Sequence, residues 1–261
     1  MRCRVLFHLL LLTAVLVAGG CATNDLEDLA SLEARTLYES ARASWKRGNY
    51  ELARDRLETL QAQFPFGPYS EQASLDIIYV YYKLEEPDSA VAAAERFLRF
   101  NPRHAQVPYV HFMLGVIEQE RGRFFLSQYF DLERDARDPQ PLAQAFRAFR
   151  TVVADYPESP YAQTARQRLV HLRNLLARHE AGVARFYLDG EAPVAAANRA
   201  ASVLEEYQGT PAVVEALDVL LESYRRMGIE DLAQDVRRVI RLNFPDHPVL
   251  QQAANTASEP D

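Results

Sequence analysis

Residues able to carry out chemistry are few and scattered in this chain of 261 residues. No two histidines beyond the apolar N-terminus have the i, i+4 spacing of a helical zinc site; they are His104, His111, His171, His179 and His247. Both cysteines, Cys3 and Cys21, lie near the N-terminus, so the rest of the chain has no thiol for a metal or redox site. No glycine-rich phosphate loop and no nucleophile elbow is present. We therefore expect no enzyme, no metal and no cofactor.

The charged residues do not indicate a catalytic centre either. Glu85-Glu86 and Glu205-Glu206 are adjacent acids, which point to different faces of a helix and suit solvent better than acid–base chemistry. The charged run from Asp131 to Asp138 is most simply a solvated turn. The formal net charge of −7 argues against a nucleic-acid partner, because proteins that bind nucleic acids usually carry a basic face.

Residues suited to binding are concentrated in positions 64–83. Two prolines and a glycine in residues 64–70 (FPFGPYS) predict a rigid turn that presents Phe66 and Tyr69. Three tyrosines then occur within positions 79–82 and cannot all face one core. Two interpretations remain open on the residues alone. The segment forms a peptide pocket, or it is an ordinary turn between repeats followed by a core helix with tyrosine hydroxyls at its rim.

The first twenty residues have the layout of a secretory signal. Arg2 and Arg4 precede an apolar run, and small residues then lead to Cys21. The run is shorter than the roughly 20 residues that a membrane span needs. A cysteine at this position resembles a bacterial lipobox, in which the cysteine is lipidated and becomes the mature N-terminus. The alternative is an ordinary signal peptide with a chance cysteine at its boundary.

The lipobox resemblance implies an acylated Cys21. Because Ala22 rather than an aspartate follows, it also implies the outer membrane, with the protein facing the periplasm. Two or three acyl chains anchor firmly, at about 0.8 kcal/mol per buried CH₂. Loss of Arg2 and Arg4 would change the formal net charge from −7 to −9, so anionic lipid would repel the mature chain. We therefore expect the lipid itself to hold the protein at the membrane.

The rest of the chain repeats itself. Four helical patterns end at a proline that has an alanine twelve residues before it: Ala53 and Pro65, Ala90 and Pro102, Ala145 and Pro157, and Ala233 and Pro245. A fifth unit has Ala196 at the same distance from Gln208. A small side chain lets two antiparallel helices approach closely, and the proline stops the second helix and forces the preceding residue out of helical geometry.

Each unit predicts two helices. In the first unit, apolar residues recur at helical spacing from Tyr38 to Trp45, Gly48-Asn49 interrupts them, and a second helix carries Leu52 to Leu60. The last unit repeats this pattern around Gly228.

These features resemble tetratricopeptide repeats over residues 34–247, although Glu85 and Glu191 stand where that family often has glycine. The predicted fold class is all-α, a right-handed α-solenoid of about five tetratricopeptide-like helix pairs.

We expect five segments along the chain. They are a lipoprotein signal peptide (1–20), a lipidated N-terminal linker (21–33), N-terminal repeat units 1–3 (34–180), C-terminal repeat units 4–5 (181–248) and a disordered tail (249–261). Longer intervals between the central repeats imply two irregular segments. One is an insertion at 123–141, and the other is an uninterrupted helical pattern from Pro160 to His179 that connects the two groups of repeats.

Several stretches together resemble the BamD (YfiO) family, the lipoprotein subunits of the outer-membrane β-barrel assembly (Bam) machine. They are FPFGPYS (64–70), LD (75–76), YYK (81–83), DARDPQ (135–140), RLV (168–170) and VAAANR (194–199). The lipobox, the five repeat units and the insertion also agree, so the resemblance covers nearly the whole chain after the signal.

The family resemblance implies a scaffold without a cofactor. Its C-terminal units would bind the periplasmic domains of the barrel-forming insertase subunit through Asn198 and Arg199. Its N-terminal units would receive C-terminal segments of unfolded outer-membrane proteins. The aromatic side chains that the resemblance assigns to this task are Phe64, Phe66, Tyr69 and Tyr81. Accessory Bam lipoproteins are further expected partners, and the membrane is contacted through the N-terminal lipid.

Three alternatives remain. Arg199 could be a solvent-exposed helix charge that pairs with Glu206 or a similar acid. The chain could be another periplasmic repeat lipoprotein, such as a pilotin-like or cell-wall-complex adaptor, which would keep the solenoid and lose the barrel partner. A hydrolase or metal enzyme would need convergent polar groups that this sequence does not offer.

Overall fold

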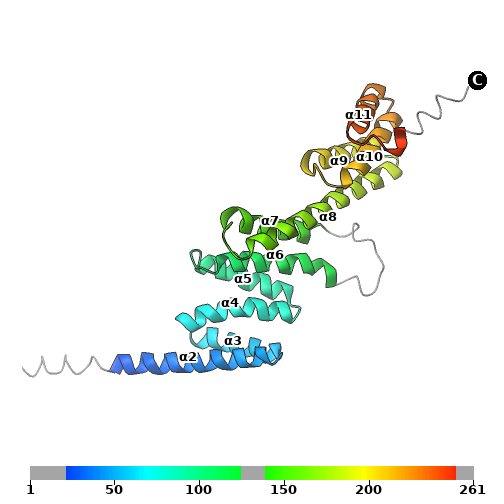
Figure 1. Ribbon diagram of the computed structural model, residues 1–261. Coiled ribbons are helices and arrows are strands. Elements are labelled where there is room, and N and C mark those ends of the chain that lie inside the picture. The colour runs from blue at the N-terminus through cyan, green and yellow to red at the C-terminus, as the bar shows by residue number, and fades with distance from the viewer. Residues whose placement is uncertain (1–21, 125–138, 251–261) are drawn as a thin grey trace, which may run out of the picture. The chain divides into compact units, whose positions relative to one another are not determined.

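The computed structural model describes residues 22–124 and 139–250, and every regular element in these ranges is an α-helix (Figure 1). In chain order the helices are α2 (Ala22–Lys46), α3 (Tyr50–Gln63), α4 (Pro68–Lys83), α5 (Pro87–Phe100), α6 (Val107–Phe124), α7 (Gln140–Asp155), α8 (Ala162–Asp189), α9 (Pro193–Glu206), α10 (Ala212–Arg226) and α11 (Glu230–Asn243). The predicted all-α class is confirmed. The signal peptide, Cys21, most of the predicted insertion and the residues after 250 lie outside the described residues.

The chain divides into two compact units, one ending at Met113 and one beginning at Leu114. In the first unit α2 packs on α3, α3 on α4 and α4 on α5, and α2 also reaches α4. In the second, each helix from α7 to α11 packs on the next, and α8 also reaches α10. Within each unit, contacts between neighbouring helices and between helices two apart give the packing of a helical solenoid, in which helix pairs stack on one another.

The five repeat alanines occupy the predicted close contacts. Ala53, Ala90, Ala145, Ala196 and Ala233 have no solvent-exposed surface at all. Each lies on the second helix of its pair, where a larger side chain would push the two helices apart. The sequence spacing therefore identified the positions at which helices meet.

The second helix of each pair ends as predicted. The residues that close these helices leave helical geometry, with φ of −127° at Phe64, −127° at Asn101, −132° at Tyr156, −119° at Tyr207 and −135° at Phe244. A proline follows four of them and excludes the helical conformation for the residue before it. Tyr207 adopts the same geometry without a proline, because Gly209 two residues later supplies a left-handed turn with φ of 76°.

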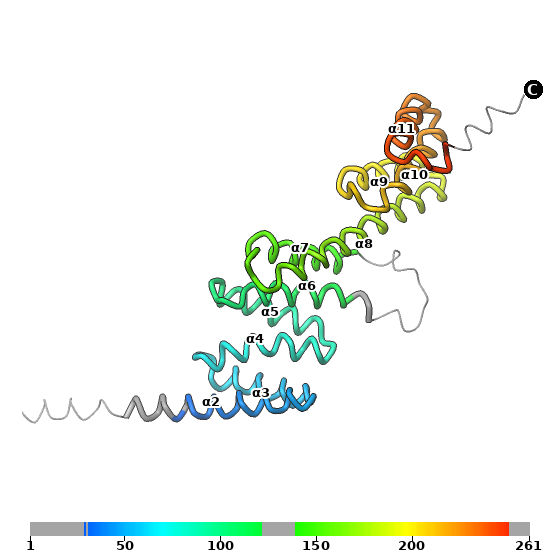
Figure 2. The backbone as a smooth tube through the Cα atoms, in the orientation of Figure 1, coloured from blue at the N-terminus to red at the C-terminus, as the bar shows by residue number. Residues whose placement is uncertain are grey.

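A left-handed residue marks the turn inside a pair. Gly48 and Gly228 have φ of 80° and 72°, and Glu85 and Glu191 have φ of 60° and 59° at the corresponding turns. Figure 2 shows the backbone reversing direction between the two helices of a pair, for example between α2 and α3. The two glutamates thus adopt a conformation that favours glycine, because a Cβ atom is sterically disfavoured there.

Two helices are longer than their repeat requires. α8 has 28 residues, starts close to the predicted Pro160 and continues to Asp189, where Gly190 closes it. Residue 180, at which the sequence suggests a change of repeat group, lies inside this helix. α2 begins at Ala22, so residues 22–33, expected as a linker, form its first turns. Apolar residues at Leu26, Leu29 and Leu32 continue the helical spacing into this segment.

Candidate functional site

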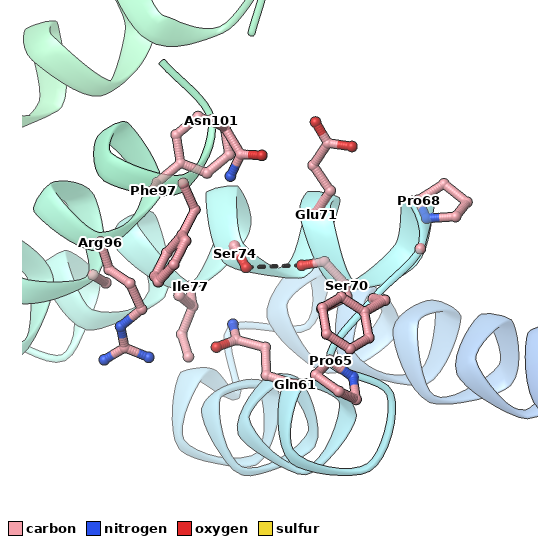
Figure 3. Close-up of a pocket in the computed structure, with 14 residues that line it drawn as sticks. Gln61, Pro65, Pro68, Ser70, Glu71, Ser74, Ile77, Arg96, Phe97 and Asn101 are labelled. Atoms are coloured by element: carbon pink, nitrogen blue, oxygen red, sulfur yellow. Dashed lines mark hydrogen bonds between the residues drawn. The ribbon is translucent and has the colours of Figure 1, made fainter. Parts of the chain in front are cut away.

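A cavity of about 730 Å³ lies in the N-terminal unit, between the end of α3, the first half of α4 and one face of α5 (Figure 3). Its walls are formed by Gln61 of α3, residues 65–67 of the turn, Pro68, Ser70, Glu71, Ser74 and Ile77 of α4, Ala93, Arg96, Phe97 and Phe100 of α5, and Asn101 directly after α5. The volume is within the range of about 300–1,000 Å³ that is usual for ligand sites.

The turn that borders the cavity has backbone angles set by its prolines and glycine. Phe64 ends α3 in an extended conformation, and Pro68 occupies the first turn of α4, where a missing N–H costs nothing. Between them Gly67 has φ of 105° and ψ of 169°, a conformation essentially restricted to glycine. Open space surrounds the position of a Cβ at Gly67, so the backbone angle alone requires glycine.

Two phenyl rings at the cavity are exposed to solvent. Phe66 is 90% exposed and Phe100 is 74% exposed, whereas Phe97 beside them is buried in the core. Exposed apolar side chains that gather at one cavity, rather than singly, are typical of interaction sites. The cavity therefore offers apolar contact area at its rim.

Polar groups in the cavity differ in how well they are satisfied. Ser74 donates a hydrogen bond to the Ser70 carbonyl at 2.8 Å, and the Glu71 carboxylate pairs with His104 Nε2 at 3.1 Å. The Gln61 amide nitrogen Nε2 is buried and has no acceptor among the described residues. Figure 3 shows this amide pointing from α3 into the cavity. Arg96 forms no hydrogen bond or ion pair within residues 22–124 and 139–250.

The four aromatics assigned to substrate binding do not converge on one surface. Phe66 lines the cavity, and Phe64 is half-buried at the end of α3. Tyr69 turns toward α2, where its ring centroid lies 5.8 Å from that of Tyr38. Tyr81 donates a hydrogen bond to Glu58 of α3 at 2.7 Å, and burial raises its pKa.

The α2 side of α4 carries a separate polar network. Tyr38 donates to one carboxylate oxygen of Asp76 at 2.8 Å, and Gln72 donates to the other at 3.0 Å. Burial raises the pKa of the Asp76 carboxyl, and the two hydrogen bonds and nearby Arg42 oppose this rise without cancelling it. Burial, and then the hydrogen bond to Asp76, raise the pKa of Tyr38. The network joins the first helices of two consecutive pairs.

The tyrosines of residues 79–82 separate as predicted. The Tyr79 ring lies 5.7 Å from Trp45 and 6.4 Å from Tyr50, in an aromatic cluster with α2 and α3. Tyr82 extends this cluster, with its ring 6.3 Å from Tyr79, whereas Tyr81 meets Glu58. One helix thus uses two faces, and no single core takes all three rings.

The C-terminal unit holds the other predicted site. Asn198 and Arg199 of α9 line a shallow cavity of about 300 Å³ together with Tyr187, Ala195 and Ser202. Arg199 Nη1 donates to Glu180 Oε2 of α8 at 3.0 Å, and 49% of the Arg199 side chain remains exposed. The intrachain acid is thus Glu180, not the Glu206 suggested by the sequence.

Exposed apolar residues adjoin this cavity along the chain. Phe186 is 73% exposed and precedes Tyr187, and Val194 is 61% exposed and precedes Ala195. A half-exposed arginine beside a tyrosine and exposed apolar side chains has the composition of a protein–protein contact surface.

Several residues that line the N-terminal cavity were not singled out from the sequence, among them Gln61, Arg96 and Phe100. Arg96 and Phe100 are four residues apart on α5 and therefore share a face, which the sequence does show. The exposure of that face depends on α3 and α4, which no pattern within α5 reveals.

Neither metal ligands nor membrane spans were found in the parts of the chain that the structure describes. Across residues 22–124 and 139–250, no three His, Cys, Asp or Glu side chains lie close enough together to hold a metal ion. No described helix combines the length and the apolar character that crossing a bilayer requires.

Comparison with known proteins gives consistent matches. Residues 31–239 match the family model YfiO, described as "Outer membrane lipoprotein". The chain is 35% identical to a Vibrio cholerae protein over 89% of this chain and 96% of that protein. It is 37% identical to a Xylella fastidiosa (strain 9a5c) protein, over 94% and 84% of the two chains. A Neisseria meningitidis serogroup A protein is 35% identical, over 94% of both chains.

All three relatives are named "Outer membrane protein assembly factor BamD". Among solved structures, PilW, described as a widely conserved type IV pilus biogenesis factor, is a more distant match. It shares 16% identity, covers 85% of this chain and 98% of its own, and has a TM-score of 0.35, which is a low structural similarity.

Proposed function

The chain belongs to the YfiO family of outer membrane lipoproteins, which includes the assembly factor BamD, and on this premise we propose that it is a non-catalytic scaffold of the Bam complex. It docks to the periplasmic domains of the barrel-forming insertase subunit and helps to receive unfolded β-barrel substrates. Binding energy alone performs this work, through the positioning of partners.

The observation that carries the docking proposal is the geometry around Arg199. Its guanidinium pairs with Glu180 through one nitrogen and is half exposed, so its other donors can meet an acceptor on a partner. An exposed intrachain pair contributes only about 0.2–1 kcal/mol to stability. An arginine that becomes desolvated in an interface can contribute more than about 2 kcal/mol to binding.

Co-purification with the barrel subunit from solubilised envelope tests this role. Arg199→Glu and Arg199→Gln are expected to weaken the complex while the melting temperature stays within about 2 °C of wild type, as for surface changes. Glu180→Gln removes the same intrachain pair but leaves Arg199 available, so it should retain the complex. Arg178→Gln, an exposed change on α8, is the matched control.

Equal loss with Arg199→Gln and Glu180→Gln would assign Arg199 a purely structural role. An unchanged complex with both Arg199 variants would remove it from the docking site. Capture of components of another secretion or cell-wall machine, without the barrel subunit, would favour the adaptor alternative.

The membrane anchor is proposed to be an acylated Cys21, which lies outside the described residues. Cys21→Ala should give a periplasmic or uncleaved form, measured by membrane fractionation and mass spectrometry. Continued outer-membrane fractionation of a fully processed Cys21→Ala chain would contradict lipid anchoring.

A further inference from the structure

The cavity between α3, α4 and α5 contains hydrogen-bond donors that the chain does not satisfy. Gln61 Nε2 is buried without an acceptor among the described residues. Buried donors in folded proteins are nearly always paired, because a buried, unpaired amide loses its interaction with water and gains nothing in return. An acceptor supplied by a bound polypeptide would satisfy it.

The two ionisable residues at the cavity differ in their contacts. Glu71 lies 3.1 Å from His104 Nε2, whereas Arg96 is exposed and has no hydrogen bond or ion pair within the described residues. The cavity therefore offers a guanidinium without an intrachain partner to a ligand, whereas its one carboxylate already has a contact. This arrangement complements an acidic group, even though the formal net charge of the chain is −7.

The apolar rim provides the second element of recognition. Arg96 and Phe100 are four residues apart on α5 and therefore share a face of that helix. Phe66, in the turn before α4, also lines the cavity. In an extended peptide, side chains two residues apart lie on one side of the chain, about 7 Å from each other. An acidic and an apolar side chain with that spacing would match Arg96 and Phe100.

We propose that this cavity docks an internal, extended segment of a partner polypeptide that carries an acidic side chain beside apolar ones. The carboxylate meets Arg96, a main-chain carbonyl accepts from Gln61 Nε2, and an apolar side chain lies between Phe66 and Phe100. The inference rests on the proposed function, because it specifies the recognition chemistry of the substrate-receiving surface that contains Phe66.

An internal segment fits the cavity better than a chain terminus. A C-terminal carboxylate is usually captured by several backbone N–H groups that converge on it. This cavity instead offers one separate guanidinium and one side-chain amide, which suit a side-chain carboxylate and a main-chain carbonyl at different points along a strand.

Fluorescence anisotropy with the full chain in detergent tests the proposal. The probe is a fluorescein-labelled, C-terminally amidated nonapeptide in which phenylalanine and tyrosine alternate with glutamine around a central aspartate. A second peptide has asparagine at the centre, and a third has the central asparagine and a free C-terminal carboxylate. The aspartate peptide is expected to bind about fivefold more tightly than either of the others, the effect of one partly exposed charge-assisted contact.

The variants separate the three contacts. Arg96→Gln should abolish the preference for aspartate, Phe100→Ser should weaken the aspartate and asparagine peptides about equally, and Gln61→Leu should weaken both without changing their ratio. Arg99→Gln, an exposed change on α5 outside the cavity, should alter neither affinity. Arg96 and Phe100 are exposed, so their variants should retain the wild-type melting temperature.

Equal affinity for the aspartate and asparagine peptides would overturn the inference, as would unchanged binding by Arg96→Gln and Phe100→Ser. Tightest binding of the peptide with a free terminus would replace the internal segment by a chain end. Docking to the barrel subunit is measured separately, by co-purification of the Arg199 variants. If Phe66→Ser abolishes peptide binding but the wild-type chain shows no preference for the aspartate peptide, the proposed function stands and this inference is rejected.

Discussion

Two helical glycines allow the packing of the solenoid to be tested with one substitution each. Gly115 of α6 faces Phe149 of α7, and a Cβ placed there would lie 2.6 Å from the ring atoms Cε1 and Cζ. Ordinary van der Waals contact begins at 3.4 Å, so the ring would have to move by about 0.8 Å. Gly182, inside α8, has nothing within 4 Å of the same position.

The ring of Phe149 has little room to move. The residue is fully buried, and the Arg168 guanidinium lies over the ring at 5.7 Å. Forcing an extra methyl group into such a site costs about 1–3 kcal/mol. Replacing glycine by alanine in a helix gains about 1 kcal/mol. Gly115→Ala should therefore lower the free energy of unfolding by up to about 2 kcal/mol, whereas Gly182→Ala should raise it by about 0.5–1 kcal/mol.

Thermal and urea unfolding, followed by circular dichroism, measure both changes. For a chain of this size a difference of 1 kcal/mol shifts the melting temperature by about 2–4 °C, so the two variants should differ visibly. Phe149→Leu supplies the cross-check, since it removes the ring atoms that the methyl group would meet. The penalty of Gly115→Ala should be smaller in the Phe149→Leu background than in wild type. Equal stabilisation by Gly115→Ala and Gly182→Ala would refute the close approach of α6 and α7.

Three further predictions concern single side chains in turns and networks. Glu191→Gly, and likewise Glu85→Gly, should raise the free energy of unfolding by about 0.5–1 kcal/mol, because glycine adopts the left-handed conformation without a steric penalty. Glu205→Gly, inside a helix, should lower the free energy of unfolding and serves as the contrast. Unchanged urea unfolding of Glu191→Gly and Glu85→Gly would show that these turns are not strained. Tyr38→Phe should raise the pKa of Asp76 further, because it removes a hydrogen bond that favours the carboxylate, and carbon-13 NMR titration of the carboxyl would detect the change. The pKa of Asp76 in the folded protein is above its ordinary value of 3.8, so its contribution to stability is fully present below pH 3.8 and declines as the pH rises through the folded pKa. Asp76→Asn should remove this decline. An identical dependence of stability on pH in the wild type and in Asp76→Asn would contradict the burial of this carboxyl.

The repeat architecture was predictable because its determinants are local. A proline excludes the helical conformation only for its neighbour, and a small residue at a fixed spacing marks where two adjacent helices touch. These rules correctly placed the five buried alanines and the ends of the second helices. The deviation at Tyr207 has a local cause too, because Gly209 replaces the missing proline as the breaker.

The two candidate surfaces were predictable only in part. Phe66 was singled out by the prolines and glycine of its turn, the pair Asn198-Arg199 was implied by the family resemblance, and each lines a cavity. The separation of Tyr69 and Tyr81 from Phe66 was not, because their partners are Tyr38 on α2 and Glu58 on α3. Which face of a helix meets which neighbour is decided by stacking, and not by spacing within the helix.

The sequence by itself determined the helix pairs and their ends, since each depends on sterics within a few neighbouring positions. Only the tertiary structure decided that Arg199 pairs with Glu180, that Gln61 is buried without an acceptor and that Gly115 admits the ring of Phe149. Those outcomes depend on distances between different helices. The packing of the helices sets these distances, and the order of residues along one helix does not reveal them.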